Sequence, residues 1–171
     1  MVRASHAIDP AWLGSAAGWL AQVAPRWEDV TGEVPTGRQY RLIASSLYVE
    51  AWLICWPSGG HLELHDHGGA CGAMQVVGGA LPEQFVADRR LPARRRHLQA
   101  GQSISFDADY AHDVVNLGDP TATSVHVYSS AARPMAYYRL TDAGMLRGAE
   151  GVDDAVVVDV APGGRSLTSA P

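Results

Sequence analysis

The stretch between Tyr40 and Tyr138 constrains the fold most, because short apolar runs alternate in it with Gly, Pro and Asp. The runs are rich in Val, Ile, Leu, Trp and Tyr, most of which favour β-strands. About eight short strands at this spacing are typical of an all-β sandwich or barrel. We expect strands at residues 40–46, 48–56, 62–66, 72–77, 80–86, 102–106, 112–116 and 122–129.

Residues 1–25 precede these strands and have the pattern of a helix. Asp9 can cap the helix, and Pro10 has the backbone angle that suits a first helical position. Apolar residues then recur at helical spacing, so we expect a helix that packs against the strands.

The length of 171 residues fits one domain. We expect an N-terminal helical segment at 1–38, a barrel at 39–140 and a C-terminal extension at 141–171. The sequence VVVDV at 156–160 is a candidate edge strand, and the final GGRSLTSAP is typical of a frayed tail.

The composition excludes several classes of protein. The net charge of -5 argues against a nucleic-acid partner, and the arginines at 89, 90 and 94–96 are typical of a solvated loop. Two cysteines do not make a disulfide-stapled secreted fold. The sequence shows neither a long apolar span nor the pattern of a secretory leader, so we expect no membrane association and a cytoplasmic location.

Two histidines one residue apart, His65 and His67, are the first sign of a metal site. On a strand, residues i and i+2 point to the same side, so both imidazoles can reach one ion. A lone pair of this kind is weak evidence, because it also arises by chance. Glycines at 59, 72 and 79 surround the pair, and Gly101, His112 and Asn116 follow at a second regular spacing.

This spacing resembles the two cupin motifs, G-x5-H-x-H-x4-E-x6-G and G-x5-P-x-G-x2-H-x3-N. The resemblance implies a cupin β-barrel, with His112 closing the site opposite the histidine pair. Gly72 stands in place of the usual glutamate, and Asp107 and Asp109 replace the proline and glycine of the second motif.

The missing glutamate makes the expected site all-histidine, whereas a common non-haem iron site has two histidines and a carboxylate. An ion among three neutral imidazoles keeps its charge and about three open positions, which suits an anionic thiolate ligand. Asp66 lies between the two histidines and should face away from the metal. Glu63 shares their strand parity, and we interpret it as a rim residue rather than a fourth ligand.

Further motifs resemble cysteine dioxygenase and its thiol dioxygenase relatives over residues 40–129. They are Tyr40-Arg41, Trp56-x8-His65-Asp66-His67-Gly68-Gly69, His112-x3-Asn116 and the run SVHVYS at 124–129. The resemblance implies that His65, His67 and His112 bind one Fe(II) per subunit. It also implies an active-site Tyr128 with His126 and Ser124 behind it, and an Arg41 that pairs with a substrate carboxylate. Residues 124, 126 and 128 share one strand face, which agrees with such a relay.

The expected reaction is therefore the oxidation of a small thiol by dioxygen, its co-substrate, to the sulfinate. L-cysteine is the first candidate, because Arg41 could pair with its carboxylate. Gln39 shares the parity of Arg41, and some bacterial relatives that use 3-mercaptopropionate carry glutamine there, so that substrate is an alternative. A metal-dependent binding or storage cupin and another metal-cupin reaction are competing hypotheses. The oligomeric state is left open.

The animal enzymes carry a cysteine cross-linked to the tyrosine at the position of Gly72. Cys71 is adjacent, but neighbours on a strand point to opposite faces. We therefore predict that no Cys71–Tyr128 thioether forms and that Cys71 is an inert buried thiol.

Overall fold

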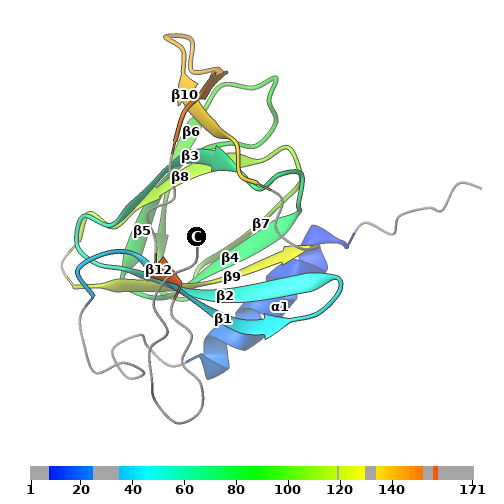
Figure 1. Ribbon diagram of the computed structural model, residues 1–171, viewed down its shortest axis with the longest axis vertical. Helices are drawn as coiled ribbons and strands as arrows, with labels where there is room; N and C mark the ends of the chain where they lie inside the picture. Colours follow the sequence, from blue (N-terminus) through cyan, green and yellow to red (C-terminus); the bar gives the residue numbers. More distant parts are fainter. Residues whose placement is uncertain (1–7, 25–34, 119, 130–133, 152–155, 158–171) are drawn as a thin grey trace, which may run out of the picture.

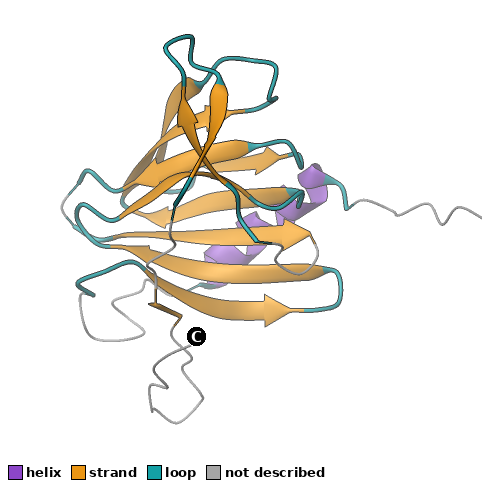
Figure 2. Cartoon of the chain, turned by 45° about the horizontal axis from the view of Figure 1, so that its top comes forward, coloured by secondary structure: helices purple, strands orange, loops and turns teal. Residues whose placement is uncertain are grey.

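A computed structural model describes residues 8–24, 35–118, 120–129, 134–151 and 156–157. It contains one helix, α1 (Pro10–Val23), and two six-stranded sheets that face each other (Figures 1 and 2). The all-β sandwich with an N-terminal helix is therefore confirmed. The strands are β1 (Gln39–Ser45), β2 (Val49–Trp56), β3 (His61–Asp66), β4 (Gly72–Gly78), β5 (Ala80–Val86), β6 (Arg94–Gln99), β7 (Ser103–Phe106), β8 (Ala111–Val115), β9 (Ala122–Ser129), β10 (Tyr137–Leu140), β11 (Leu146–Ala149) and β12 (Val156–Val157).

The first sheet, with the order β12-β1-β2-β9-β4-β7, carries α1 on its outer face and is called the helix-covered sheet. Asp9 accepts a hydrogen bond from the Ala11 amide, and Pro10 begins the helix, as the sequence predicts. Leu13 and Ala17 are fully buried against β2, β4 and β9. The helix thus closes one face of the sheet and leaves the other to line the interior.

Strand alternation divides the residues of β2 and β9 between these two faces. Leu53 and Val125 pack in the cluster under α1, whereas Ile54 and Trp56 belong to the cluster between the sheets. Ser124, His126 and Tyr128 alternate with the helix-facing residues, so they face the interior. The hydrophobic pattern of each strand therefore decides which side chains can form an internal site.

The opposite sheet has the order β11-β10-β3-β8-β5-β6. Its central strands β3 and β8 are antiparallel, with His65 paired with His112 and Asp66 with Ala111. The register shifts between Leu62 and His65. Because β3 and β8 are adjacent, both halves of the predicted histidine set lie in one sheet.

Three strands were not predicted from the sequence: β6, β10 and β11. The interpretation of Arg94–Arg96 as a solvated loop is wrong, because these arginines begin β6 and pair with β5. An edge strand can carry charged side chains that point to solvent. In β6 the run of arginines obscured the alternation of apolar and polar residues that is typical of a strand. The candidate strand at 156–160 is confirmed for Val156–Val157, which pair with β1, and residues 158–160 lie outside the described residues. No helix in the described part of the chain is long and apolar enough to cross a membrane.

Candidate metal centre

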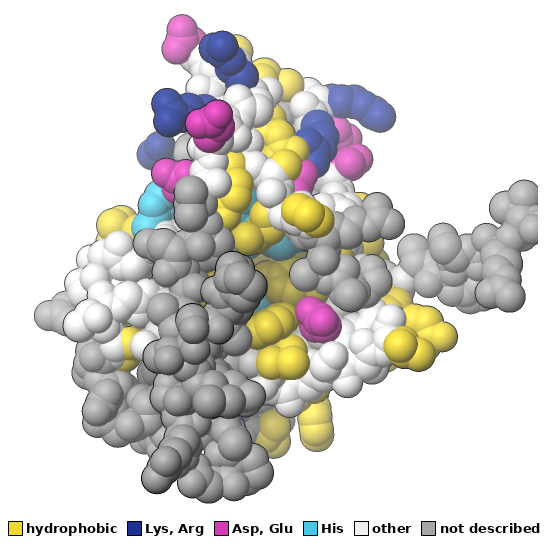
Figure 3. All heavy atoms as spheres, viewed as in Figure 1, with side chains coloured by type: hydrophobic (Ala, Val, Ile, Leu, Met, Phe, Trp, Pro, Cys, Tyr) yellow, Lys and Arg dark blue, Asp and Glu magenta, His cyan; other side chains and the backbone are white. Residues whose placement is uncertain are grey.

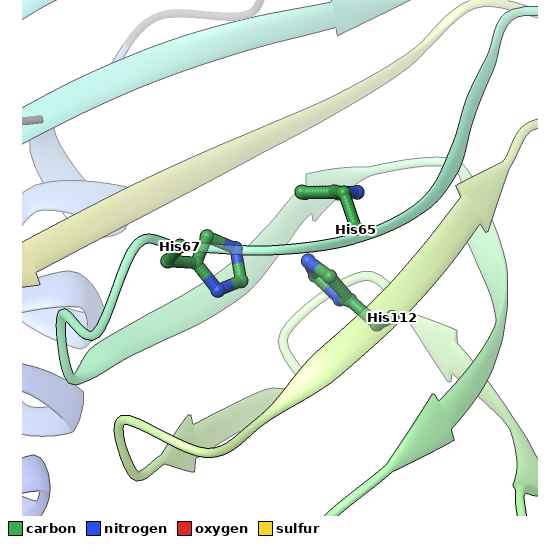
Figure 4. A group of neighbouring side chains, drawn as sticks. All are labelled: His65, His67 and His112. Atoms are coloured by element: carbon green, nitrogen blue, oxygen red, sulfur yellow. The ribbon is translucent and has the colours of Figure 1, made fainter. Parts of the chain in front are cut away.

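Three buried histidines, His65, His67 and His112, meet between the sheets. His65 comes from β3, His67 directly follows that strand, and His112 comes from β8. One potential ligand atom from each lies within 4.8 Å of the others, and the ring centroids are 4.9 to 5.1 Å apart. Figure 4 shows the three rings around one small space. The predicted histidine set is thus brought together.

Burial keeps two imidazoles of this set, those of His65 and His67, uncharged. Desolvation, with a smaller contribution from His112, lowers the pKa of His65 to about 3 and that of His67 well below its usual value. His65 Nδ1 lies 2.7 Å from the Glu63 carbonyl oxygen and donates to it, which leaves Nε2 as the ligand atom. Neither ring nitrogen of His67 has a hydrogen-bond partner in the described structure. Neutral imidazoles with unused buried nitrogens fit a metal ion.

A buried carboxylate, Glu83 on β5, orients the third histidine. His112 Nδ1 and the Tyr110 hydroxyl each donate to Glu83 Oε1 at 2.5 Å, and Arg96 of β6 donates to Oε2. Burial alone would raise the pKa of Glu83, but the bonds from His112 and Arg96 outweigh it and lower that pKa to about 2. Glu83 is therefore ionised and fixes His112 with Nε2 toward the site.

The sequence did not predict this carboxylate, and it corrects the expectation that no protein anion offsets the ion. The negative charge lies behind a ligand rather than on the metal. Leu81, Glu83 and Phe85 share one face of β5, and Leu81 and Phe85 are buried. A glutamate on an apolar strand face must have a partner when it is buried, so this pattern could have identified Glu83 as part of the site.

Ser124, His126 and Tyr128 form a hydrogen-bonded chain along β9. Ser124 Oγ lies 2.9 Å from His126 Nε2, and His126 Nδ1 lies 2.9 Å from the Tyr128 hydroxyl. Trp56 Nε1 donates to Ser124 Oγ at 2.8 Å, and an indole can only donate. Burial lowers the pKa of His126 to about 3, so the ring is neutral.

The indole fixes the first hydrogen bond, in which Ser124 Oγ accepts from Trp56. With the Ser124 proton directed to His126 Nε2, the His126 proton sits on Nδ1. That proton is donated to the Tyr128 oxygen. In this tautomer the Tyr128 oxygen accepts from His126, and Tyr128 itself lines the neighbouring cavity.

A cavity of about 460 Å³ joins the three histidines to this chain. Both His126 and Tyr128 line it, and the Tyr128 and His67 ring centroids are 5.0 Å apart. In Figure 3, hydrophobic and histidine side chains lie recessed at the centre of the visible face. The apolar part of the wall consists of Ile54, Leu62, Ala70, Val114, Pro134 and Met135. Such a wall limits water at the site.

Arg41 does not line this cavity. In the pairing of β1 with β2, Tyr40 is opposite the inward Ile54, whereas Arg41 is opposite Leu53, which packs under α1. Gln39 is opposite Cys55 and lies on the same outward face. The expectation that Arg41 holds the substrate is therefore not supported, because its strand parity directs it away.

Arg38 shares the parity of Tyr40 and is buried. Its guanidinium carbon lies 5.5 Å from the Tyr40 ring centroid and 5.6 Å from that of Trp56, and it donates to the His61 carbonyl. Arg38 lines a second hollow with His61 and Glu63 rather than the histidine cavity. It therefore supports the aromatic wall from behind.

The model of the cysteine dioxygenase type I family matches residues 34–139. The chain belongs to this family. No curated protein sequence matches it at a significant level.

Solved structures show the fold of this family member. A protein from Bacillus halodurans is 17% identical, with a TM-score of 0.52 over 65% of this chain and 83% of that one. An oxalate oxidase in complex with glycolate is 19% identical, with a TM-score of 0.52 over 60% and 56% of the two chains. Peruvianin-I, a cysteine peptidase from Thevetia peruviana latex, is 16% identical, with a TM-score of 0.52 over 61% and 71%. At these identities the likeness extends to the cupin fold alone.

The packing around Gly72 explains why a small residue stands at this position of the family's motifs. It pairs directly with Tyr128 across β4 and β9. A Cβ at this position would lie 2.5 Å from the Phe106 ring and 3.0 Å from Tyr128 Cδ1. Phe106 thus fills the space that the family's larger residue would need. Cys71 packs against the cluster under α1, away from Tyr128, and is a free thiol whose pKa is raised by burial.

Asp66 faces away from the histidines, as predicted. Its carboxylate accepts from the Ala136 amide at 3.0 Å, the Tyr138 hydroxyl at 2.7 Å and Arg89 at 2.6 Å. Asp66 therefore ties β10 to β3, and Arg89 is an ion-pair partner rather than a solvated charge. Glu63 is exposed and is not part of the histidine cluster.

Proposed function

We propose that this protein is a non-haem Fe(II) thiol dioxygenase that converts a small thiol to its sulfinate. The observation that carries the proposal is the shared cavity, in which three buried histidines lie beside a hydrogen-bonded Ser124–His126–Tyr128 chain. Membership of the cysteine dioxygenase type I family supports the same chemistry. A binding or storage cupin would need the histidines but not the hydroxyl chain.

Some residues of this protein would bind the metal ion, and others would position the groups around it. His65, His67 and His112 would hold the ion, with Glu83 fixing His112. Bound Fe(II) would supply open coordination positions at which a thiolate and dioxygen meet. Tyr128 would place its hydroxyl beside the substrate in the cavity, and His126 and Ser124 would hold that hydroxyl from behind. The apolar wall keeps competing water away.

The overall reaction is balanced without another reductant. The thiol loses its proton, and the thiolate sulfur gives four electrons to dioxygen. Both oxygen atoms form bonds to sulfur, and the oxygen–oxygen bond breaks. The product is the sulfinate anion, RSO2⁻.

L-cysteine was the expected substrate because Arg41 was expected to pair with its carboxylate, and 3-mercaptopropionate was the alternative. Because Arg41 lies on the outer face of β1, its pairing with a carboxylate no longer favours L-cysteine over 3-mercaptopropionate. The proposed function therefore concerns the thiol group and the sulfinate product.

Dioxygen uptake tests the proposed function. Protein loaded anaerobically with Fe(II) should consume dioxygen when a small thiol is added and form the sulfinate, measured with an oxygen electrode and by mass spectrometry. His112→Ala should lose iron and uptake together. The proposal fails if loaded protein consumes no dioxygen with any small thiol, or if zinc-loaded protein is equally active.

A further inference from the structure

The charges on the cavity wall are unequal. Glu50 is the single carboxylate among the described residues that line the cavity, and no lysine or arginine is among them. Four histidines also line it: the three candidate metal ligands and His126. Apart from the histidines and a bound metal ion, Glu50 is therefore the one ionisable acid or base with an ordinary charge on the described wall.

Glu50 lies beside the catalytic tyrosine. It pairs directly with Tyr128 across β2 and β9, and side chains opposite each other on antiparallel strands lie on one face with Cβ atoms about 5 Å apart. The Tyr128 ring in turn lies tilted beside that of His67, with 5.0 Å between ring centroids. Glu50 is half-buried, so its carboxylate is only partly screened by solvent. A substrate held at the histidines would have its far end near this carboxylate.

Aromatic rings continue the same wall. Tyr40 and Trp52 line the cavity in an edge-to-face pair with 6.4 Å between centroids. Ring faces attract ammonium groups, and a carboxylate next to them adds to that attraction. Neither nearby arginine is among the described residues that line the cavity: Arg38 lies behind Tyr40, within electrostatic reach of His65, and Arg41 lies on the outer face.

From this wall we infer that the cavity selects thiols that carry a protonated amine and disfavours mercapto acids, with Glu50 as the partner of the ammonium group. The inference rests on the proposed function, since it names the substrate class of the same site. The simplest such substrate has the form HS–CH2–CH2–NH3⁺. Glu50 would repel the carboxylate of a substrate such as 3-mercaptopropionate.

Three thiols with one skeleton and different ends test this selectivity. They are cysteamine, 2-mercaptoethanol and 3-mercaptopropionate, which end in an ammonium, a hydroxyl and a carboxylate. Wild-type iron-loaded protein should have a kcat/KM at least about tenfold higher for cysteamine than for 3-mercaptopropionate, as one charge-assisted contact would give. A higher kcat/KM for 3-mercaptopropionate overturns the inference.

Glu50→Gln separates the charge from the shape of the cavity. This variant should lose about tenfold in kcat/KM for cysteamine, gain for 3-mercaptopropionate and keep the value for 2-mercaptoethanol. Glu150→Gln is the matched control, because Glu150 is exposed and does not line the histidine cavity. If Glu50→Gln changes kcat/KM for all three thiols by the same factor, Glu50 does not select the ammonium group.

Binding without turnover separates this inference from the proposed function. Thiolate binding to Co(II)-loaded protein gives a charge-transfer absorption, from which a Kd follows for each thiol. If cysteamine binds most tightly but no thiol consumes dioxygen, the selectivity holds and the dioxygenase proposal fails. If 3-mercaptopropionate is oxidised best, the dioxygenase proposal holds and the selectivity fails. In that second case, Arg38→Gln and Arg133→Gln would show which arginine binds the carboxylate of 3-mercaptopropionate. Arg133 lies outside the described residues.

Discussion

His112 donates from Nδ1 to Glu83 Oε1 over 2.5 Å, and both side chains are almost completely buried. Tyr110 and Arg96 hold the same carboxylate. The candidate ligand set is therefore all-histidine, but one of its imidazoles is polarised by a fixed anion. Such a partner orients a ligand and makes it more basic, so it should strengthen metal binding.

Replacing this carboxylate tests its effect on the metal. Glu83→Gln keeps the shape of the side chain but removes the charge that His112 and Arg96 share. We expect iron affinity to fall by about 10- to 100-fold, measured by competition with a chelator. Glu150→Gln should leave the affinity unchanged. Unchanged affinity in Glu83→Gln would show that the hydrogen bond does not support the metal.

The hydroxyl chain should affect turnover rather than metal binding. Tyr128→Phe removes the donor and keeps the ring that contacts His67. We expect kcat to fall about a hundredfold, the usual effect of losing a positioned proton donor, with iron content unchanged. Ser124→Ala should have a smaller effect, because it acts through His126. Full kcat in Tyr128→Phe would exclude a role for the hydroxyl.

Stability of the metal-free protein should decrease at acidic pH because of His126. Burial lowers its pKa to about 3 in the folded state, whereas the unfolded chain takes up the proton near pH 6.5. As the pH falls below 6.5, the unfolded state gains the proton first, and stability is lost until about pH 3. Between pH 7.5 and 5 this histidine alone should cost about 2 kcal/mol of unfolding free energy.

Urea unfolding of metal-free wild type and His126→Gln at both pH values measures this cost. The wild type should lose more stability than the variant, and the difference between the two losses is the contribution of His126. Equal losses would mean that His126 titrates alike in the folded and unfolded states.

The space opposite Tyr128 gives a prediction about packing. Gly72→Ala places a methyl group 2.5 Å from the Phe106 ring, and overpacking of this kind costs about 1–3 kcal/mol. Gly78→Ala is the matched control in the same strand, because its Cβ would have no neighbour within 4 Å. Adding Phe106→Leu to Gly72→Ala should restore part of the loss in thermal unfolding. A neutral Gly72→Ala would show that Phe106 moves without cost.

The metal ligands could be predicted because their information is local. His65 and His67 are two residues apart, at the end of β3 and directly after it, and the resemblance to the cupin motifs implied His112, which lies in the neighbouring strand. The resemblance to the thiol dioxygenases implied the chain from Ser124 to Tyr128, and strand parity agreed with it. Arg41 failed because Tyr40 and Arg41 are adjacent and only one of them can face inward. The sequence alone does not show which parity β1 presents.

Glu83, Arg96 and Tyr110 could not be predicted for a different reason. They lie on β5, on β6 and just before β8, and they meet only because of the register between β5 and its two neighbours. The arginine run also has the composition of an exposed loop, which concealed β6. Contacts of this kind depend on tertiary pairing rather than on local pattern.

Isotope labelling tests the central claim most directly. Iron-loaded protein is given cysteamine or L-cysteine under ¹⁸O2, and the product is analysed by mass spectrometry. A thiol dioxygenase should yield a sulfinate in which both oxygen atoms are labelled. A disulfide with peroxide, or a sulfinate whose oxygen comes from water, would contradict the account.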